Sequence, residues 1–138
     1  MAPPMSEASL RQGVRNVVVT GAAQGIGLAT VKRFARAHDR VVLLDLDEVR
    51  LEHEVSRLRS EGRMVLAVTC DVGDPEAVAR AFANIGQKMN TINVLVNNAA
   101  AFVMEGVMAS SQAWRKVLDV NVGPSDYVPQ LNDFKVAY

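Results

Sequence analysis

The feature that most constrains this chain is an apolar run that ends in a cluster of glycines, Asn16 to Gly27 (NVVVTGAAQGIG). Three consecutive valines and a threonine predict a short strand that is buried on both faces. Because glycine carries no Cβ, the chain can turn sharply after this strand and a ligand can approach its backbone. Beyond Gly25 apolar residues recur at helical spacing, so a helix is expected to direct its first amides and its dipole at the turn. Strand, turn and helix together predict a cradle for a pyrophosphate.

The spacing of the glycines separates two kinds of phosphate site. A nucleoside triphosphate loop would close with Gly-Lys-Ser or Gly-Lys-Thr, and Gly25 is followed by isoleucine. The ordinary dinucleotide fingerprint is G-x-G-x-x-G, whereas here three residues separate Gly21 from Gly25. The motif Thr20-Gly-x-x-x-Gly-Ile-Gly27 resembles the fingerprint of the short-chain dehydrogenase/reductase family. The resemblance continues at Asp45, Asp71-Val72, Asn97-Asn98-Ala99 and Asn121.

The order of apolar runs and helical patterns agrees with the fold that this resemblance implies. Predicted strands at 17–20, 40–45, 64–69 and 92–96 alternate with helices, and right-handed crossovers give the strand order 3-2-1-4. The predicted fold class is α/β, a Rossmann-like doubly wound parallel sheet of about four strands. We expect this sheet to be incomplete, because full domains of the family run to roughly 250 residues.

The resemblance also implies which residues would hold a nicotinamide dinucleotide. Asp71 would contact the adenine amino group and Val72 would flank the ring, while Ala100 stands where the family usually has glycine. The predicted cofactor-binding residues are Thr20, Gly21, Gln24, Gly25, Ile26, Gly27, Asp45, Leu46, Asp71, Val72, Asn97 and Ala99. No residue is assigned to a metal.

Asp45 predicts which dinucleotide is preferred. It ends the second predicted strand, about 20 residues beyond the glycines, where a carboxylate accepts hydrogen bonds from the adenosine ribose. A 2′-phosphate about 4 Å away would be repelled by roughly 1 to 4 kcal/mol per unit charge. The glycine loop offers neutral Gln24 and no basic residue to offset this repulsion. We therefore expect NAD to be preferred over NADP. The alternative, that Asp45 caps the next helix, stays open, although Asp47 is at least as well placed.

The family reaction moves a hydride between nicotinamide and an alcohol or carbonyl carbon. A tyrosine, assisted by a lysine four residues later, transfers the proton, and a serine orients the oxygen. By resemblance Asn121 matches the asparagine of the catalytic tetrad, and a helix C-cap is its alternative role. Tyr127 is followed four places later by Leu131, and Tyr138 is the last residue. We therefore expect an NAD-dependent alcohol or ketone oxidoreductase that is truncated before its catalytic serine, tyrosine and lysine, and inactive alone.

Composition limits the other partners. Lys and Arg total 15, as do Asp and Glu, so no net field attracts nucleic acid or an anionic membrane. No apolar run reaches transmembrane length, and residues 1–15 lack the apolar core of a secretory signal. We expect a cytoplasmic protein with a disordered tail at 1–15. The one cysteine, Cys70, follows an apolar run and is expected to be a buried thiol without a catalytic role.

The dinucleotide-binding domain is predicted to cover residues 16–122, followed by an irregular tail unlike the family at 123–138. Helix caps are predicted at Asp47, at Asp74 and at Ser110 or Ser111. In the last helix we expect Trp114, Val117 and Leu118 to pack inward. The fourth strand lacks a predicted neighbour, so its edge is expected to be exposed and to invite self-association unless the tail or a partner covers it.

Two other interpretations stay open. The chain could be a non-catalytic NAD-binding or regulatory module that pairs with a full-length relative, which saturable NAD binding without turnover would support. It could also be a non-functional product of an early stop, an alternative splice form or a misread intron. Poor solubility and no saturable binding would indicate such a fragment.

Overall fold

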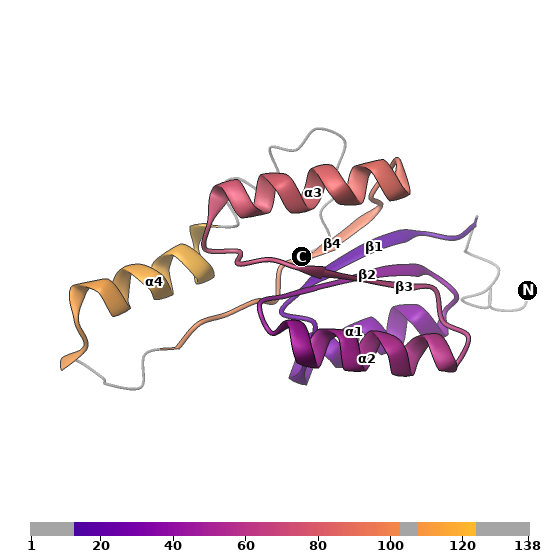
Figure 1. The fold of residues 1–138 in the computed structure, drawn as a ribbon, viewed down its shortest axis with the longest axis horizontal. Coiled ribbons are helices and arrows are strands. Elements are labelled where there is room, and N and C mark those ends of the chain that lie inside the picture. The colour runs from indigo at the N-terminus through magenta and orange to yellow at the C-terminus, as the bar shows by residue number, and fades with distance from the viewer. Residues whose placement is uncertain (1–12, 103–107, 124–138) are drawn as a thin grey trace, which may run out of the picture.

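The computed structural model describes residues 13–102 and 108–123, which form a parallel sheet covered by helices (Figure 1). The elements are β1 (Asn16–Thr20), α1 (Gly25–Arg36), β2 (Arg40–Asp45), α2 (Glu48–Ser60), β3 (Val65–Thr69), α3 (Pro75–Met89), β4 (Val94–Val96) and α4 (Ser111–Asn121). All strand pairs are parallel, in the order β3-β2-β1-β4. The predicted fold class and strand order are confirmed.

The central strands β1 and β2 are buried on both faces, as their unbroken apolar runs predict. α1 and α2 cover one face of the sheet and α3 covers the other (Figure 1). Val17 and Val19 pack with α1 and α2, whereas Val18, between them, packs with α3. Each side chain buried in this way stabilises the fold by about 1.5 to 3 kcal/mol relative to exposure. The two cores fix the sheet between its helices and so fix the positions of the strand ends.

The strand and helix ends differ little from the predicted bounds. β4 begins at Val94 rather than residue 92, because the side-chain oxygen of Asn93 accepts a hydrogen bond from the backbone N–H of Asn16 at 2.7 Å, in place of a ladder carbonyl. The predicted caps are confirmed: Asp47, Asp74 and Ser110 accept hydrogen bonds from backbone N–H groups in the first turns of α2, α3 and α4. In the described part of the chain, no helix is both long and apolar enough to cross a membrane.

An ion pair between half-buried Arg15 and buried Asp39 joins the amino ends of the strands. Asp39, 1% exposed, accepts hydrogen bonds from the Arg15 side chain at 2.7 and 3.2 Å and from the Arg15 backbone N–H at 3.2 Å. This side-chain bonding is the main cause that raises the pKa of Arg15 above its ordinary value. The Arg15 guanidinium also lies 5.2 Å from the centre of the Phe34 ring. Arg15, the last residue of the predicted tail at 1–15, thus contacts the domain. Residues 1–12 of that tail, and residues 124–138 of the predicted tail at 123–138, lie outside the described residues.

The predicted inward packing of α4 is wrong for Trp114 and Leu118, whereas Val117 is half-buried. Trp114 is 45% exposed and Leu118 is 56% exposed, and none of the residues of α4 is buried. α4 projects beyond the carboxyl ends of the strands instead of lying over a face of the sheet (Figure 1). Val120 is the residue of α4 that reaches the α3 core.

Candidate functional site

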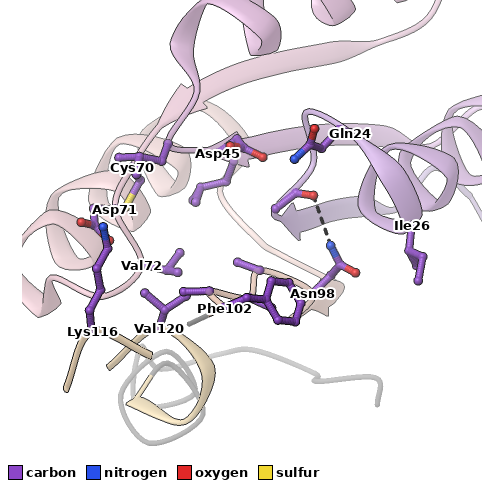
Figure 2. Close-up of a pocket in the computed structure, with 16 residues that line it drawn as sticks. Gln24, Ile26, Asp45, Cys70, Asp71, Val72, Asn98, Phe102, Lys116 and Val120 are labelled. Carbon is purple, nitrogen blue, oxygen red and sulfur yellow. Dashed lines mark hydrogen bonds between the residues drawn. The ribbon is translucent and has the colours of Figure 1, made fainter. Parts of the chain in front are cut away.

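A cavity of about 520 Å³ opens where the carboxyl ends of the strands meet the amino end of α1 (Figure 2). In open α/β sheets this edge is where ligands bind. Most of the predicted cofactor-binding residues line it, namely Gly21, Gln24, Ile26, Asp45, Leu46, Asp71, Val72 and Ala99. Thr20, Gly25, Gly27 and Asn97 are not part of its lining. Thus four loops that lie far apart in the sequence form one site.

Two glycines let the turn after β1 pack tightly. A Cβ on Gly21, whose φ is +63°, would lie 2.8 Å from Cα of Ala99. A Cβ on Gly27 would lie 2.0 Å from the carbonyl oxygen of Gly21. Real Cβ atoms do not approach backbone atoms so closely, so both positions require glycine. The turn is therefore pressed between the first turn of α1 and the end of β4.

The first turn of α1, Gly-Ile-Gly-Leu, contains no acidic side chain that could pair with its amides. The cap residue, Gln24, has an extended backbone, and its carbonyl accepts from Leu28 N–H at 3.1 Å. Its side chain does not cap the helix but accepts a hydrogen bond from the guanidinium of Arg50. The positive end of the helix dipole thus faces the cavity, an arrangement suited to an anion.

The ends of β1 and β4 are tied by Thr20 and Asn98, a set of hydrogen bonds that we call the Thr20–Asn98 clamp. The Thr20 hydroxyl oxygen accepts from the backbone N–H groups of Asn98 and Ala99, each at 3.0 Å. The Asn98 side-chain amide donates to the carbonyls of Thr20 at 3.2 Å and Gly21 at 3.1 Å. Figure 2 shows the second of these bonds. Because Thr20 is buried, its structural role is to form this clamp. The Asn98 amide thus joins the neighbouring strand ends, whereas Asn97 is exposed.

Asp45 holds the glycine turn against β2. One carboxylate oxygen accepts from the Ala23 N–H at 2.9 Å and the other from the Asp47 N–H at 3.0 Å. The alternative role of Asp45 as a helix cap is wrong, because Asp47 caps α2 through the Arg50 N–H at 3.0 Å. Each carboxylate oxygen has two lone pairs, so these bonds leave acceptor capacity toward the cavity.

The end of β3 supplies a mixed polar and apolar wall. The carboxylate of Asp71 accepts from the Gly73 N–H at 2.8 Å, and the Val72 side chain is almost fully buried beside it. Burial, helped by the charges of Asp71 and Asp74, raises the pKa of the Cys70 thiol to about 11. Cys70 is therefore a neutral thiol at physiological pH, and the prediction that it is buried is confirmed.

Asn121 does not line the cavity. Its side-chain oxygen accepts from the Ala101 N–H at 2.7 Å, and its amide donates to the Ala101 carbonyl at 2.9 Å. The C-cap of α4 is Val122, so the side chain of Asn121 does not cap its own helix. It instead ties the end of α4 to the segment after β4, and Ala101 and Phe102 of this segment line the cavity.

Some wall residues lie outside the predicted set of cofactor-binding residues. They include Asn98, Phe102, Lys116 and Val120 (Figure 2). Lys116 and Val120 come from α4, whose position at the strand ends the sequence does not reveal. For Asn98 a signal existed, because adjacent residues in extended chain point to opposite sides. One of the two neighbours Asn97 and Asn98 therefore had to point toward the β1 turn.

Comparisons with known proteins assign the fold and site to a family. The family model described as short chain dehydrogenase matches residues 15–125. The chain is similar to 1-deoxy-11-beta-hydroxypentalenate dehydrogenase of Streptomyces arenae, with 46% identity over 85 residues, 62% of this chain and 30% of that enzyme. It is 36% identical over 128 residues to the short chain dehydrogenase/reductase dpmpG of Macrophomina phaseolina (strain MS6), covering 90% of this chain and 73% of that protein.

Among solved structures, the chain resembles a blue fluorescent protein from a metagenomic library, crystallised in complex with NADPH. The TM-score is 0.77 at 25% identity, and the match covers 84% of this chain and 49% of that chain. The chain thus spans about half the length of this structural relative and less than a third of the Streptomyces enzyme. On the family match and the glycine turn, strand order and cavity, the chain belongs to the short-chain dehydrogenase family.

Proposed function

We propose that this chain binds a nicotinamide dinucleotide in the cavity at the strand ends, as the cofactor half of an alcohol or ketone oxidoreductase. The observation that carries the proposal is the juxtaposition in one cavity of the α1 amino end, the Asp45 carboxylate and the pair Asp71 and Val72. The pyrophosphate would lie against the first amides of α1. The adenosine ribose would bond Asp45, and the adenine would lie between Asp71 and Val72.

The preferred dinucleotide is proposed to be NAD. The carboxylate of Asp45 is fixed in place by the N–H groups of Ala23 and Asp47, so it cannot swing away from a 2′-phosphate without breaking both bonds. A repulsion of about 1 to 4 kcal/mol per unit charge at about 4 Å corresponds to roughly a fivefold to several-hundredfold preference.

We propose that residues 1–138 by themselves bind cofactor without turning over substrate. The family's proton transfer uses Tyr-x-x-x-Lys, a pair that this sequence does not contain. Loss of a general acid–base group costs about a hundredfold to ten-thousandfold in rate. Asn121, bonded to Ala101, is proposed to keep the segment after β4 in place beside the nicotinamide end of the site.

Calorimetric titration with NAD and NADP tests the site. Wild-type chain is expected to bind both saturably, NAD more tightly. Asp45→Asn keeps an oxygen for the Ala23 N–H but removes the charge, so the NAD/NADP affinity ratio should fall about tenfold. Glu52→Gln makes the same charge change on the exposed side of α2 and should leave the ratio unchanged. A folded chain that binds neither dinucleotide would refute the proposal.

A pairing role is the second candidate, and one observation favours it. Among the described residues β4 is the outermost strand on its side of the sheet, the position at which a further strand could be added. We propose that a second copy pairs there. Light scattering should then show a mass that rises with concentration, and a monomer throughout a wide concentration range would contradict pairing.

A further inference from the structure

A second, smaller cavity lies between the carboxyl ends of α1 and α2. Both helices begin near the carboxyl ends of the strands and lead back to the amino end of the next strand, so this cavity lies on the side of the domain away from the dinucleotide site (Figure 1). Its volume is about 70 Å³, and its apolar lining is Ala35 and Leu58, both buried. Pockets for whole small molecules measure roughly 300 to 1,000 Å³. This cavity therefore has room for one small group of atoms.

Positively charged side chains dominate the lining of this cavity, which we call the basic pocket. They are Lys32, Arg36, Arg57 and Arg63, whereas Glu61 supplies a single carboxylate. Lys32 and Arg36 lie four positions apart on α1, where like charges repel each other. The chain as a whole has equal numbers of basic and acidic residues, so the excess positive charge is local to this pocket.

The turn after α2 fixes Arg63 at the basic pocket. Gly62, whose φ is +76°, reverses the chain, and the Arg63 N–H donates to the carbonyl of Leu58 at 3.0 Å. The Arg63 side chain is half-buried, and within the described part of the chain its buried Nε–H has no hydrogen-bond partner. Leaving a buried donor without an acceptor is unfavourable. An acceptor that reaches this guanidinium would therefore stabilise the folded chain.

The charges around the basic pocket do not cancel. Each helix carboxyl end carries about −0.5 elementary charge, so the ends of α1 and α2 together offset about one of the four cations. Glu61 offsets another. Glu54 accepts a hydrogen bond from Arg57 at 2.7 Å and offsets a third. Among the described residues, roughly one positive charge is left without a counterpart.

We propose that the basic pocket is a second ligand site, which binds a small phosphate-class oxyanion, either inorganic phosphate or the phosphate of a small monoester. Guanidinium groups present planar forks of N–H donors that match phosphate oxygens, and the Lys32 ammonium adds a point charge. The volume of about 70 Å³ suits one tetrahedral group and excludes a nucleotide. A bound oxyanion would join the ends of α1 and α2 and stabilise the fold by mass action. This site does not depend on the dinucleotide site.

Two variants test the pocket, and each removes one cation. Lys32→Gln and Arg63→Gln should each weaken phosphate binding about fivefold to tenfold, the effect of a unit charge at about 4 Å near a solvated surface. Arg63→Lys keeps the charge and should lose less affinity than Arg63→Gln. Lys88→Gln is the matched control, because Lys88 is exposed in the last turn of α3 and does not line the pocket. It should bind phosphate as wild type does.

Binding is measured on the whole chain by ¹H–¹⁵N NMR during titration with sodium phosphate and, separately, with glycerol 3-phosphate. Sodium chloride keeps the ionic strength constant. Saturable shifts of the Arg63 Nε–H and of the backbone amides of residues 61–63 are expected. Binding of both ligands would show that the pocket recognises the phosphate group itself, and binding of inorganic phosphate alone would identify the free ion as the ligand.

Three results would overturn the proposal. They are shifts that chloride reproduces, shifts confined to the amides of residues 25–28 at the glycine turn, and equal affinities in wild type, Lys32→Gln and Arg63→Gln. Far-UV circular dichroism checks that each variant is folded, and Lys32→Gln decides alone if Arg63→Gln does not fold. A chain that binds phosphate here but no dinucleotide would refute the proposed function and leave this site in place.

Discussion

Gly27 offers the sharpest test of how the site is built. In Gly27→Ala the new Cβ would lie 2.0 Å from the Gly21 carbonyl oxygen and 2.6 Å from the Asn98 side-chain nitrogen. The first contact is with backbone, and the second is with an amide held by its own hydrogen bonds, so neither neighbour can yield without moving α1. Overpacking of this kind costs about 1 to 3 kcal/mol. The higher helix propensity of alanine offsets at most about 1 kcal/mol of this destabilisation.

Gly86→Ala is the matched control, because Gly86 also lies inside a helix, α3, and a Cβ there would meet no described atom within 4 Å. Urea unfolding followed by circular dichroism should show Gly27→Ala less stable than wild type by about 1 to 2 kcal/mol. Gly86→Ala should be more stable by about 0.5 to 1 kcal/mol. NAD binding to Gly27→Ala should weaken more than its stability loss explains, because the turn itself is displaced. If both alanine variants gain stability equally, the close packing of the turn is refuted.

Three further predictions concern single side chains. Asn98→Ala leaves two carbonyls at the end of β1 without their amide donor. In urea unfolding this variant should be less stable than wild type by about 1 to 3 kcal/mol. Asn97→Ala, at an exposed position, should stay within about 0.5 kcal/mol of wild type. Asp39→Ala removes the acceptor of three hydrogen bonds from Arg15 and should cost about 1 to 3 kcal/mol, measured by thermal unfolding. An unchanged midpoint would show that the ion pair contributes nothing. Folding raises the pKa of the Cys70 thiol from the ordinary 9.0 to about 11, so the folded state holds this proton more tightly than the unfolded state. The stability that this difference contributes is present below pH 9.0 and is lost as the pH rises from 9.0 to about 11. Wild-type unfolding free energy should therefore fall more steeply with pH there than that of Cys70→Ala, and parallel pH curves would contradict a buried neutral thiol.

Much of the fold could be predicted because its signals are local. Unbroken apolar runs such as the three valines of β1 specify buried parallel strands, and each run is followed by a turn residue or a cap. The order 3-2-1-4 then follows from the limited ways in which such units can connect. The caps at Asp47 and Asp74 are also local, since each side chain bonds an N–H two or three residues away.

The details of the site depend on contacts that no local pattern contains. The side chain of Gln24 bonds Arg50 on another helix, and this contact could not be read from the glycine loop alone. Trp114 and Leu118 have helical spacing, but spacing shows only that two residues share a face and not what that face meets. α4 lies beyond the strand ends, and Trp114 and Leu118 are therefore exposed.

The Thr20–Asn98 clamp also has a consequence for folding kinetics. Its hydrogen bonds join residues 77 to 79 positions apart, which makes them among the least local contacts in the described chain. Chain entropy must be lost before such contacts form, and folds that depend on them form slowly. β4 can join β1 only after the intervening helices and strands have brought it into reach. The last wall of the cavity is thus expected to form late, and dinucleotide binding would report completion of the sheet.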